Sequence, residues 1–373
     1  MHLADILAKR AKTLAGSAPE IFNLARPGDR QKLSRLLASR AVHHVRDDFE
    51  EQMREYFQVS HPALVYIPDF EEKFQEHLSL MAKKMPLWQR GRWVYFPWLS
   101  TVSHILEDKE FQMVRTARNR NLITQKEQGQ FYNAIIGIAG LSIGNSVALT
   151  IALQGGGRYI RLADNDRLAL SNTNRIRSGV DSLGIPKIEM TARQIYALNP
   201  YAKVDLFPDG ITEKNIARFF AGPPRLDLVI DEIDNLAIKH LMRQYAKKHK
   251  IAVVMATDNG DHGLVDIERY DTHPDTKFFH GRMGSENYEE LKKLNKFAAG
   301  KKIANFVGVE NVPPRMIASL KEIGKTLVSW PQLGGAALLN GSAVAYCARK
   351  ILTDGHLVSN RMFISLDGAA GKK

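Results

Sequence analysis

A glycine-rich segment in the middle of the chain has the residue types and spacing of a phosphate-binding turn. The stretch IIGIAGLSIG (135–144) is typical of a buried strand that turns through glycines into a helix, which aims backbone N–H groups at an anion beside the helix start. Gly137 holds the first position of a G-x-G-x-x-G fingerprint, whereas Ala139 and Ser142 stand at the other two. Because glycines are also needed where a helix and a strand pack closely, the turn alone leaves a structural role open.

Charged and amide side chains follow this turn at spacings that suit a nucleotide. Asp164 and Asp166 end the next predicted strand. Asp164 lies about 20 residues on from the turn, where dinucleotide-binding folds place a ribose-binding acid. Asn172 and Arg175 lie in the polar loop that follows, and Lys187 stands at a predicted helix start. An arginine fork and a lysine charge that face one pocket stabilise the charge that builds up during transfer at phosphorus. Each residue alone could be an ordinary turn or helix-start residue, but together they favour ATP over nicotinamide chemistry.

A third polar group ends the apolar stretch LDLVIDEIDN (226–235). Carboxylates at the carboxyl end of a parallel strand face the crevice in which such sheets bind ligands, which places Asp231, Glu232 and Asp234 there. One of them could hold Mg²⁺, an ion that prefers carboxylate and phosphate oxygens. Asp234 could equally cap the helix expected to begin near Leu236.

The composition limits the classes of protein that the chain can represent. Of its 373 residues, 52 are basic and 40 acidic, and the net charge of +12 permits nucleic acid as a partner. A solvated basic surface is favoured, because no nucleic-acid-binding motif is recognised. Cys347 is the only cysteine, which excludes an internal disulfide and a four-cysteine zinc site. No apolar run approaches the roughly 20 residues that cross a bilayer, so we expect a cytoplasmic protein without membrane attachment.

The chain divides into two patterns. Residues 1–125 predict a helical N-terminal domain, because apolar residues recur at helical spacing in 29–57 and 70–85. Residues 126–373 alternate apolar strand and amphipathic helix patterns, which predicts a Rossmann-like α/β domain with a doubly wound, mostly parallel sheet and helices on both faces. The expected strands are 134–138, 159–163, 203–207, 226–230, 251–256 and 264–270; the expected helices are 143–153, 188–197, 213–220 and 235–249. A polar crossover region (272–325) follows.

As an ordered set, these motifs resemble the ThiF/MoeB family of adenylation domains in ubiquitin-activating enzymes, over about 118–366. GLSIG, FFHGRMG and SWPQL are most similar to a bacterial branch in which some relatives carry a nitroreductase-like domain. The resemblance implies a homodimer that binds ATP and Mg²⁺. It also implies adenylation of a carboxylate, commonly the C-terminal glycine of a ubiquitin-like protein, with release of pyrophosphate.

The resemblance also assigns roles to residues by motif. Arg175, Lys187 and Asp234 would be catalytic, with Asp234 as the Mg²⁺ ligand. The neighbouring subunit would contribute Arg120 from RTARNRN (115–121), with Arg118 in reserve. The residues expected to contact the nucleotide are Gly137, Gly140, Leu141, Ser142, Asp164, Asp166, Asn172, Asn174, Arg175, Lys187, Asp231, Asp234 and Asn235.

The chain departs from the family pattern in two ways. Paired C-x-x-C motifs are absent, so we expect no zinc. The crossover region also lacks a cysteine to accept a thioester, and Cys347 in its apolar surroundings is expected to be an inert thiol. The reaction should therefore stop at the acyl-adenylate or pass it to an amine, a sulfur donor or another protein. His262 and His280 could line the acceptor side or be ordinary loop histidines.

The leading hypothesis is activation of a carboxylate on a ubiquitin-like or sulfur-carrier protein, a peptide or a small acid. The alternatives are an ATP-dependent tRNA-modifying dehydratase, an NAD-binding Rossmann oxidoreductase, and a peptide-modifying enzyme whose N-terminal domain holds a leader peptide. That domain could also be a dimerisation arm, a docking platform or a lid.

Overall fold

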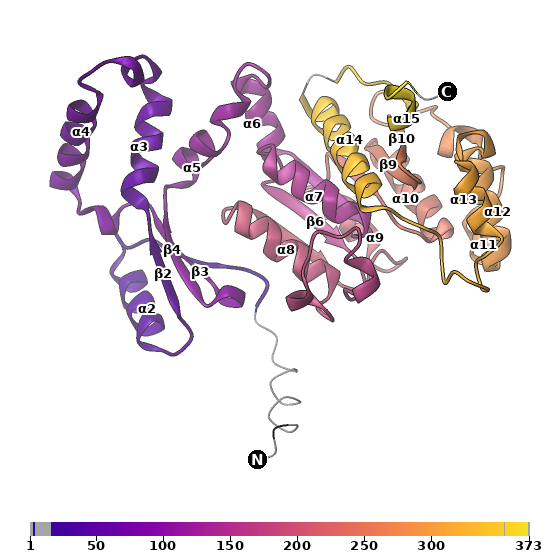
Figure 1. Ribbon diagram of the computed structural model, residues 1–373, viewed down its shortest axis with the longest axis horizontal. Helices are drawn as coiled ribbons and strands as arrows, with labels where there is room; N and C mark the ends of the chain where they lie inside the picture. The colour runs from indigo at the N-terminus through magenta and orange to yellow at the C-terminus, as the bar shows by residue number, and fades with distance from the viewer. Residues whose placement is uncertain (1–2, 4–15, 354, 372–373) are drawn as a thin grey trace. The chain divides into compact units, whose positions relative to one another are not determined.

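A computed structural model describes residues 3, 16–353 and 355–371 (Figure 1). The chain forms two compact units. One comprises the described residues up to Leu122 together with Tyr196–Tyr201, and the other comprises Ile123–Ile195 and the described residues from Ala202 onward.

The N-terminal unit contains a four-stranded sheet, so the expectation of a helical domain is wrong in this respect. The strand order is β1-β3-β4-β2, with β2 parallel to β4 and the other pairs antiparallel. The strands are β1 (Glu20–Phe22), β2 (His44–Asp47), β3 (Arg92–Phe96) and β4 (Thr101–Ile105); the helices are α2 (Pro27–Ala38), α3 (Phe49–Ser60), α4 (Phe70–Lys84) and α5 (Asp108–Arg115). Aromatic and β-branched residues in RWVYF and TVSHI suit a pleated sheet better than a helix. Apart from Leu3, residues 1–15 of the predicted domain lie outside the described residues.

The second unit is built on a seven-stranded sheet of order β11-β10-β9-β8-β5-β6-β7. The strands are β5 (Ile135–Ala139), β6 (Tyr159–Ala163), β7 (Lys203–Phe207), β8 (Leu228–Asp231), β9 (Ala252–Asn259), β10 (His262–Glu268) and β11 (Asn360–Ile364). β5 to β9 are parallel, whereas β10 and β11 pair antiparallel. The chain runs outward from β5 to β6 and β7, then returns to the other side of β5 at β8. This reversal forms the crevice in which such sheets bind ligands.

Helices cover the sheet on both faces, which confirms the predicted fold class. α7 packs against α14, α14 also packs against β9 and β10, and α10 packs against α9 and β9 (Figure 1). The helices of this unit are α6 (Gln125–Asn133), α7 (Ile143–Leu153), α8 (Lys187–Leu198), α9 (Ile216–Ala221), α10 (Leu236–His249) and α14 (Gly334–Thr353). The predicted elements from β5 to α10 are recovered with shifts at their ends, because long apolar runs mark buried strands clearly.

The predicted crossover region folds into short elements. These are α11 (Tyr288–Lys292), α12 (Lys296–Val307) and α13 (Pro314–Leu320), with α15 (Leu366–Ala369) near the end of the chain. Phe279, Met283 and Leu291 bury their side chains together with residues of α10 and β9. Within the described residues, no helix is long and apolar enough to cross a membrane.

Candidate functional site

The glycine turn joins the ends of three strands. Gly140 has a φ of +86°, and a Cβ at this position would lie 2.3 Å from the carbonyl oxygen of Glu232, just after β8. A side chain there would meet both backbone strain and a collision, so the position requires glycine. The next residue, Leu141, donates its N–H to Asp164 Oδ2 at 2.7 Å, at the end of β6. The turn is therefore fixed against β6 and β8 at the carboxyl edge of the sheet.

Asp164 holds this turn in place. Its Oδ1 accepts the N–H of Asp166 at 2.8 Å, so both carboxylate oxygens receive backbone hydrogen bonds. Burial raises the pKa of Asp164, although these two N–H groups and the charge of Lys187 oppose the increase. Asp164 is 9% exposed, whereas the side chain of Asp166 is 65% exposed. Asp166 is thus the more accessible of the two acids to a ribose.

Lys187 and Arg175 approach the turn from the loop between β6 and α8. Lys187 Nζ lies 2.8 Å from Asp166 Oδ2, and the lysine side chain is 7% exposed. Arg175 Nε donates to Ser142 Oγ at 3.1 Å, immediately before α7. Ser142 is the N-cap of α7, so this bond attaches Arg175 to a helix start whose first N–H groups have no partner within the helix. Arg175 thus contacts the helix start, and Lys187 pairs with Asp166, whose N–H bonds to the acid that holds the turn.

The two asparagines of the loop have structural partners. Asn172 Oδ1 accepts the N–H of Ala169 at 3.0 Å, which closes the turn that precedes Arg175. Asn174 Nδ2 donates to the carbonyl oxygen of Gln332 at 2.8 Å, which attaches the loop to the segment before α14. Both side chains shape the loop that carries Arg175.

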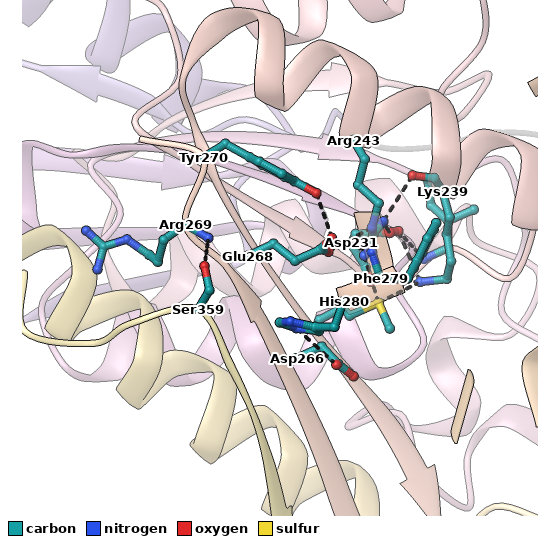
Figure 2. A network of polar contacts seen from close by, with 12 residues as sticks. Asp231, Lys239, Arg243, Asp266, Glu268, Arg269, Tyr270, Phe279, His280 and Ser359 are labelled. Atoms are coloured by element: carbon teal, nitrogen blue, oxygen red, sulfur yellow. Dashed lines mark hydrogen bonds and ion pairs between the residues drawn. The ribbon is translucent and has the colours of Figure 1, made fainter. Parts of the chain in front are cut away.

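The residues after β8 fall into two groups. Asp231 is fully buried: it lies 2.5 Å from Arg243 Nη1 and 3.3 Å from Lys239 Nζ, which lower its pKa (Figure 2). Asn235 is the N-cap of α10, with Oδ1 accepting the N–H of Ile238 at 3.1 Å. Asp234 is exposed, and its carboxylate makes no hydrogen bond or ion pair within the described residues. Asp234 is therefore the acid of this stretch that remains open to a ligand.

Several sequence candidates lie away from this edge or have packing roles. A Cβ on Gly137 would lie 2.6 Å from Leu226 and 2.8 Å from Phe219, so this glycine makes room for packing. Arg120 belongs to the N-terminal unit, where Nη1 donates to the carbonyl oxygen of Val59 at 3.3 Å.

The two histidines and the cysteine of the sequence analysis are at least half buried. His262 Nε2 lies 3.8 Å from Asp367 Oδ2, and His280 Nε2 lies 3.5 Å from Asp266 Oδ1. Burial raises the pKa of Cys347 to about 11, which makes it a poor nucleophile.

Asp258 is a site residue that sequence reasoning missed. It lies near the carboxyl end of β9, is 3% exposed, and accepts hydrogen bonds from Asn340 Nδ2 at 2.7 Å and Gln332 Nε2 at 3.3 Å. Burial raises its pKa, and the nearby charge of Arg175 lowers it. The sequence signal is the polar pair Asp258-Asn259 directly after an apolar strand, the same signal that marked the end of β8.

The arrangement defines a nucleotide-binding α/β domain whose carboxyl edge gathers cations, exposed acids and a helix start. The chain belongs to the ThiF family, whose family model matches residues 116–306. An uncharacterized protein of Mycobacterium tuberculosis, MT1398, is 36% identical over 307 residues, which cover 81% of this chain and 42% of that protein. The tRNA threonylcarbamoyladenosine dehydratase of Escherichia coli is 30% identical, with 42% of this chain and 57% of that protein covered. The chain thus spans about half the length of these relatives.

The comparison with solved structures also found matches, one of which is an E. coli protein. The crystal structure of E. coli MccB with ATP is 19% identical to this chain, covers 68% of it and 69% of its own length, and has a TM-score of 0.49.

Proposed function

We propose that the chain is an ATP-dependent adenylyltransferase that activates a carboxylate, with residues 126–373 as the adenylation domain. Membership of the ThiF family supports this activity, as does the similarity of part of the chain to the sulfur carrier protein adenylyltransferase of Thermus thermophilus, at 27% identity over 113 residues. The substrate would be the C-terminus of a ubiquitin-like protein, a peptide or a small acid. In the reaction, a carboxylate oxygen forms a bond to the α-phosphorus of ATP while the bond to pyrophosphate breaks.

The residues of the carboxyl edge suit this chemistry. A carboxylate is already a nucleophile at neutral pH, so alignment and charge stabilisation are what the protein must supply. The N–H groups at the start of α7 would face phosphate oxygens, and Arg175, held by Ser142, would donate to them. Lys187 would exchange part of its contact with Asp166 for a phosphate. Asp166, or Asp164 behind it, would accept a ribose hydroxyl.

The site also suits Mg²⁺. Within the described residues no group of three or more histidine, cysteine or acidic side chains could enclose a metal ion. Mg²⁺ commonly binds through one or two carboxylates together with substrate phosphates, and Asp234 is an exposed carboxylate free for that role. Mg²⁺ held by Asp234 would neutralise part of the negative charge of the phosphates. In a homodimer, Arg120 of one subunit would add a further positive charge to the site of the other.

One observation carries the proposal: Arg175 contacts Ser142 at the start of α7, and Lys187 pairs with Asp166, beside the acid that holds the glycine turn. The first test is calorimetric titration of the chain with ATP·Mg and with NAD in parallel. We expect saturable binding of ATP·Mg only. Saturable NAD binding without ATP binding would identify the oxidoreductase alternative instead.

The second test is carboxylate-dependent exchange of pyrophosphate into ATP. We expect Arg175→Ala and Lys187→Ala each to reduce exchange by about 100-fold, with much smaller effects on ATP affinity, because their charges act mainly on the transition state. Arg177→Ala is the matched control, since this arginine is exposed two residues from Arg175. Unchanged exchange in both site variants would remove these residues from the mechanism.

A tRNA-modifying activity is the second candidate. It is favoured by the similarity to tRNA threonylcarbamoyladenosine dehydratases of E. coli and Bacillus subtilis, at 30% and 28% identity, together with the net charge of +12. Retained tRNA binding that weakens steeply between 50 and 200 mM salt would support it. Absence of tRNA binding at low salt would leave the protein or small-acid substrates.

A further inference from the structure

A cavity lies between α10 and the first part of the crossover region, in the second unit. It has a volume of about 300 Å³, and its wall combines apolar side chains, including Phe278 and Met283, with His240, Lys247 and Lys277. None of the residues at the carboxyl edge assigned to the nucleotide lines it. Its volume is at the lower end of the range for small-molecule sites.

His240 gives this cavity an unsatisfied polar group. The residue is 9% exposed, and its Nδ1 has no hydrogen-bond partner in the part of the chain that the structure describes. Its ring meets the ring of Phe278 edge to face, with centroids 5.2 Å apart. Burial and the charge of Arg243 lower the pKa of His240, so the imidazole is neutral at neutral pH and can donate or accept through Nδ1. Buried polar atoms without partners are uncommon and costly. This atom is closed off from solvent, so a ligand would gain a hydrogen bond to it by turning the ring toward the cavity.

Lys247 and Lys277 give the lining of the cavity a net positive charge. Lys247 Nζ donates to the carbonyl oxygen of Thr276 at 3.4 Å and lies 5.7 Å from the centre of the Phe278 ring. Within the described part of the chain, neither Lys247 nor Lys277 pairs with an acid. Glu286 also lines the cavity, but Lys302 pairs with it and offsets its charge.

We propose that this cavity binds a small organic carboxylate with a flat apolar body. The carboxylate would contact Lys247 and Lys277, the flat body would lie against Phe278 and Met283, and a polar atom of the ligand would meet His240 Nδ1. This site goes beyond the proposed adenylation and does not depend on it, because the two sets of residues are separate.

The probe pair is indole-3-acetate and its neutral isostere indole-3-acetamide, titrated calorimetrically into the whole chain without nucleotide. We expect saturable binding of the acid with a Kd below about 1 mM, and binding of the amide at least about 10-fold weaker, because it lacks the charge. Equal binding of the two probes, or no saturable binding of the acid, would overturn the proposal.

Substitutions of the lining residues test whether the acid binds in this cavity. Lys247→Gln and Lys277→Gln should each weaken binding of the acid by about fivefold or more, whereas Lys248→Gln, an exposed neighbour outside the cavity, should leave it unchanged. His240→Leu should weaken binding and yet raise the Tm, because it removes a buried polar atom without a partner. Binding must also persist in Lys187→Ala. Loss of binding in that variant would move the acid to the nucleotide edge and contradict a separate site.

Discussion

Two groups of charged residues in the second unit use the same side-chain types for opposite purposes. Arg243 is fully buried, 2.5 Å from Asp231 and 2.8 Å from Glu268, and Glu268 also accepts hydrogen bonds from Tyr270 Oη and the N–H of Phe279 (Figure 2). At the carboxyl edge, the hydrogen-bond partners of Arg175 among the described residues are neutral oxygens, namely a hydroxyl, an amide and a backbone carbonyl. The buried charges neutralise one another and are not available to a ligand. The charge of Arg175 at the edge is not neutralised in this way, so it is available to an anionic ligand.

The sharpest test of this difference is Arg243→Ala. It would leave Asp231 and Glu268 buried without their shared cation, so we expect the free energy of unfolding to fall by about 3–5 kcal/mol. Urea unfolding at pH 7 measures it, with the exposed Arg177→Ala as the control, for which we expect a change within about 0.5 kcal/mol. A decrease in the free energy of unfolding below about 1 kcal/mol for Arg243→Ala would mean that the buried charge cluster does not stabilise the fold.

A smaller effect should come from Asp266, an acid of the same buried region. It is 1% exposed, with Arg361 Nε at 2.7 Å, and burial raises its pKa to about 6 despite this partner. Because the unfolded value is about 4, the folded state binds the proton more strongly between pH 4 and 6. The contribution of Asp266 to stability therefore falls as the pH rises through this window and stays level above it.

The measurement is the free energy of unfolding of the wild type minus that of Asp266→Asn, between pH 4.5 and 7. We expect this difference to fall with rising pH, by at most about 1.4 kcal/mol per pH unit. Repeating the comparison in a His280→Gln background removes the titration of His280, which lies 3.5 Å from Asp266. A difference that stays constant or rises with pH would contradict the raised pKa.

Local patterns in the sequence were sufficient for the sheet and for the glycine turn. Apolar runs bounded by glycine or polar residues predicted β5 to β9. The spacing to Asp164 predicted a ribose-binding acid, and the structure shows that this carboxylate accepts the N–H of Leu141 in the glycine turn. β2 of the N-terminal unit could not be predicted from local pattern, because it reads HVRD, is exposed along its whole length and has no apolar face. Its place is set by pairing with β4, more than 50 residues later.

The role of each acidic residue depends on contacts with residues that are distant in the sequence. Asp231 and Asp234 look equivalent in VIDEIDN, but a buried arginine on α10 engages only the first. Asp258 receives its hydrogen bonds from Gln332 and Asn340, more than 70 residues away in the chain. Such long-range partners cannot be read from local spacing, so the sequence identified the stretch that carries the site but not the roles of its members.

The smallest expected change is in the stability of Asp234→Asn. Its carboxylate is exposed and unbonded within the described residues, so the free energy of unfolding should change by less than about 0.5 kcal/mol. Asp231→Asn should instead destabilise the fold by more than about 1 kcal/mol, because it removes a buried counter-charge of both Lys239 and Arg243. If Asp234 is the Mg²⁺ ligand, its substitution should raise the Mg²⁺ concentration needed for ATP binding by about 10-fold, measured by titration calorimetry. A normal Mg²⁺ requirement with normal stability would leave Asp234 without a role at the edge, and would place the metal on the phosphates alone.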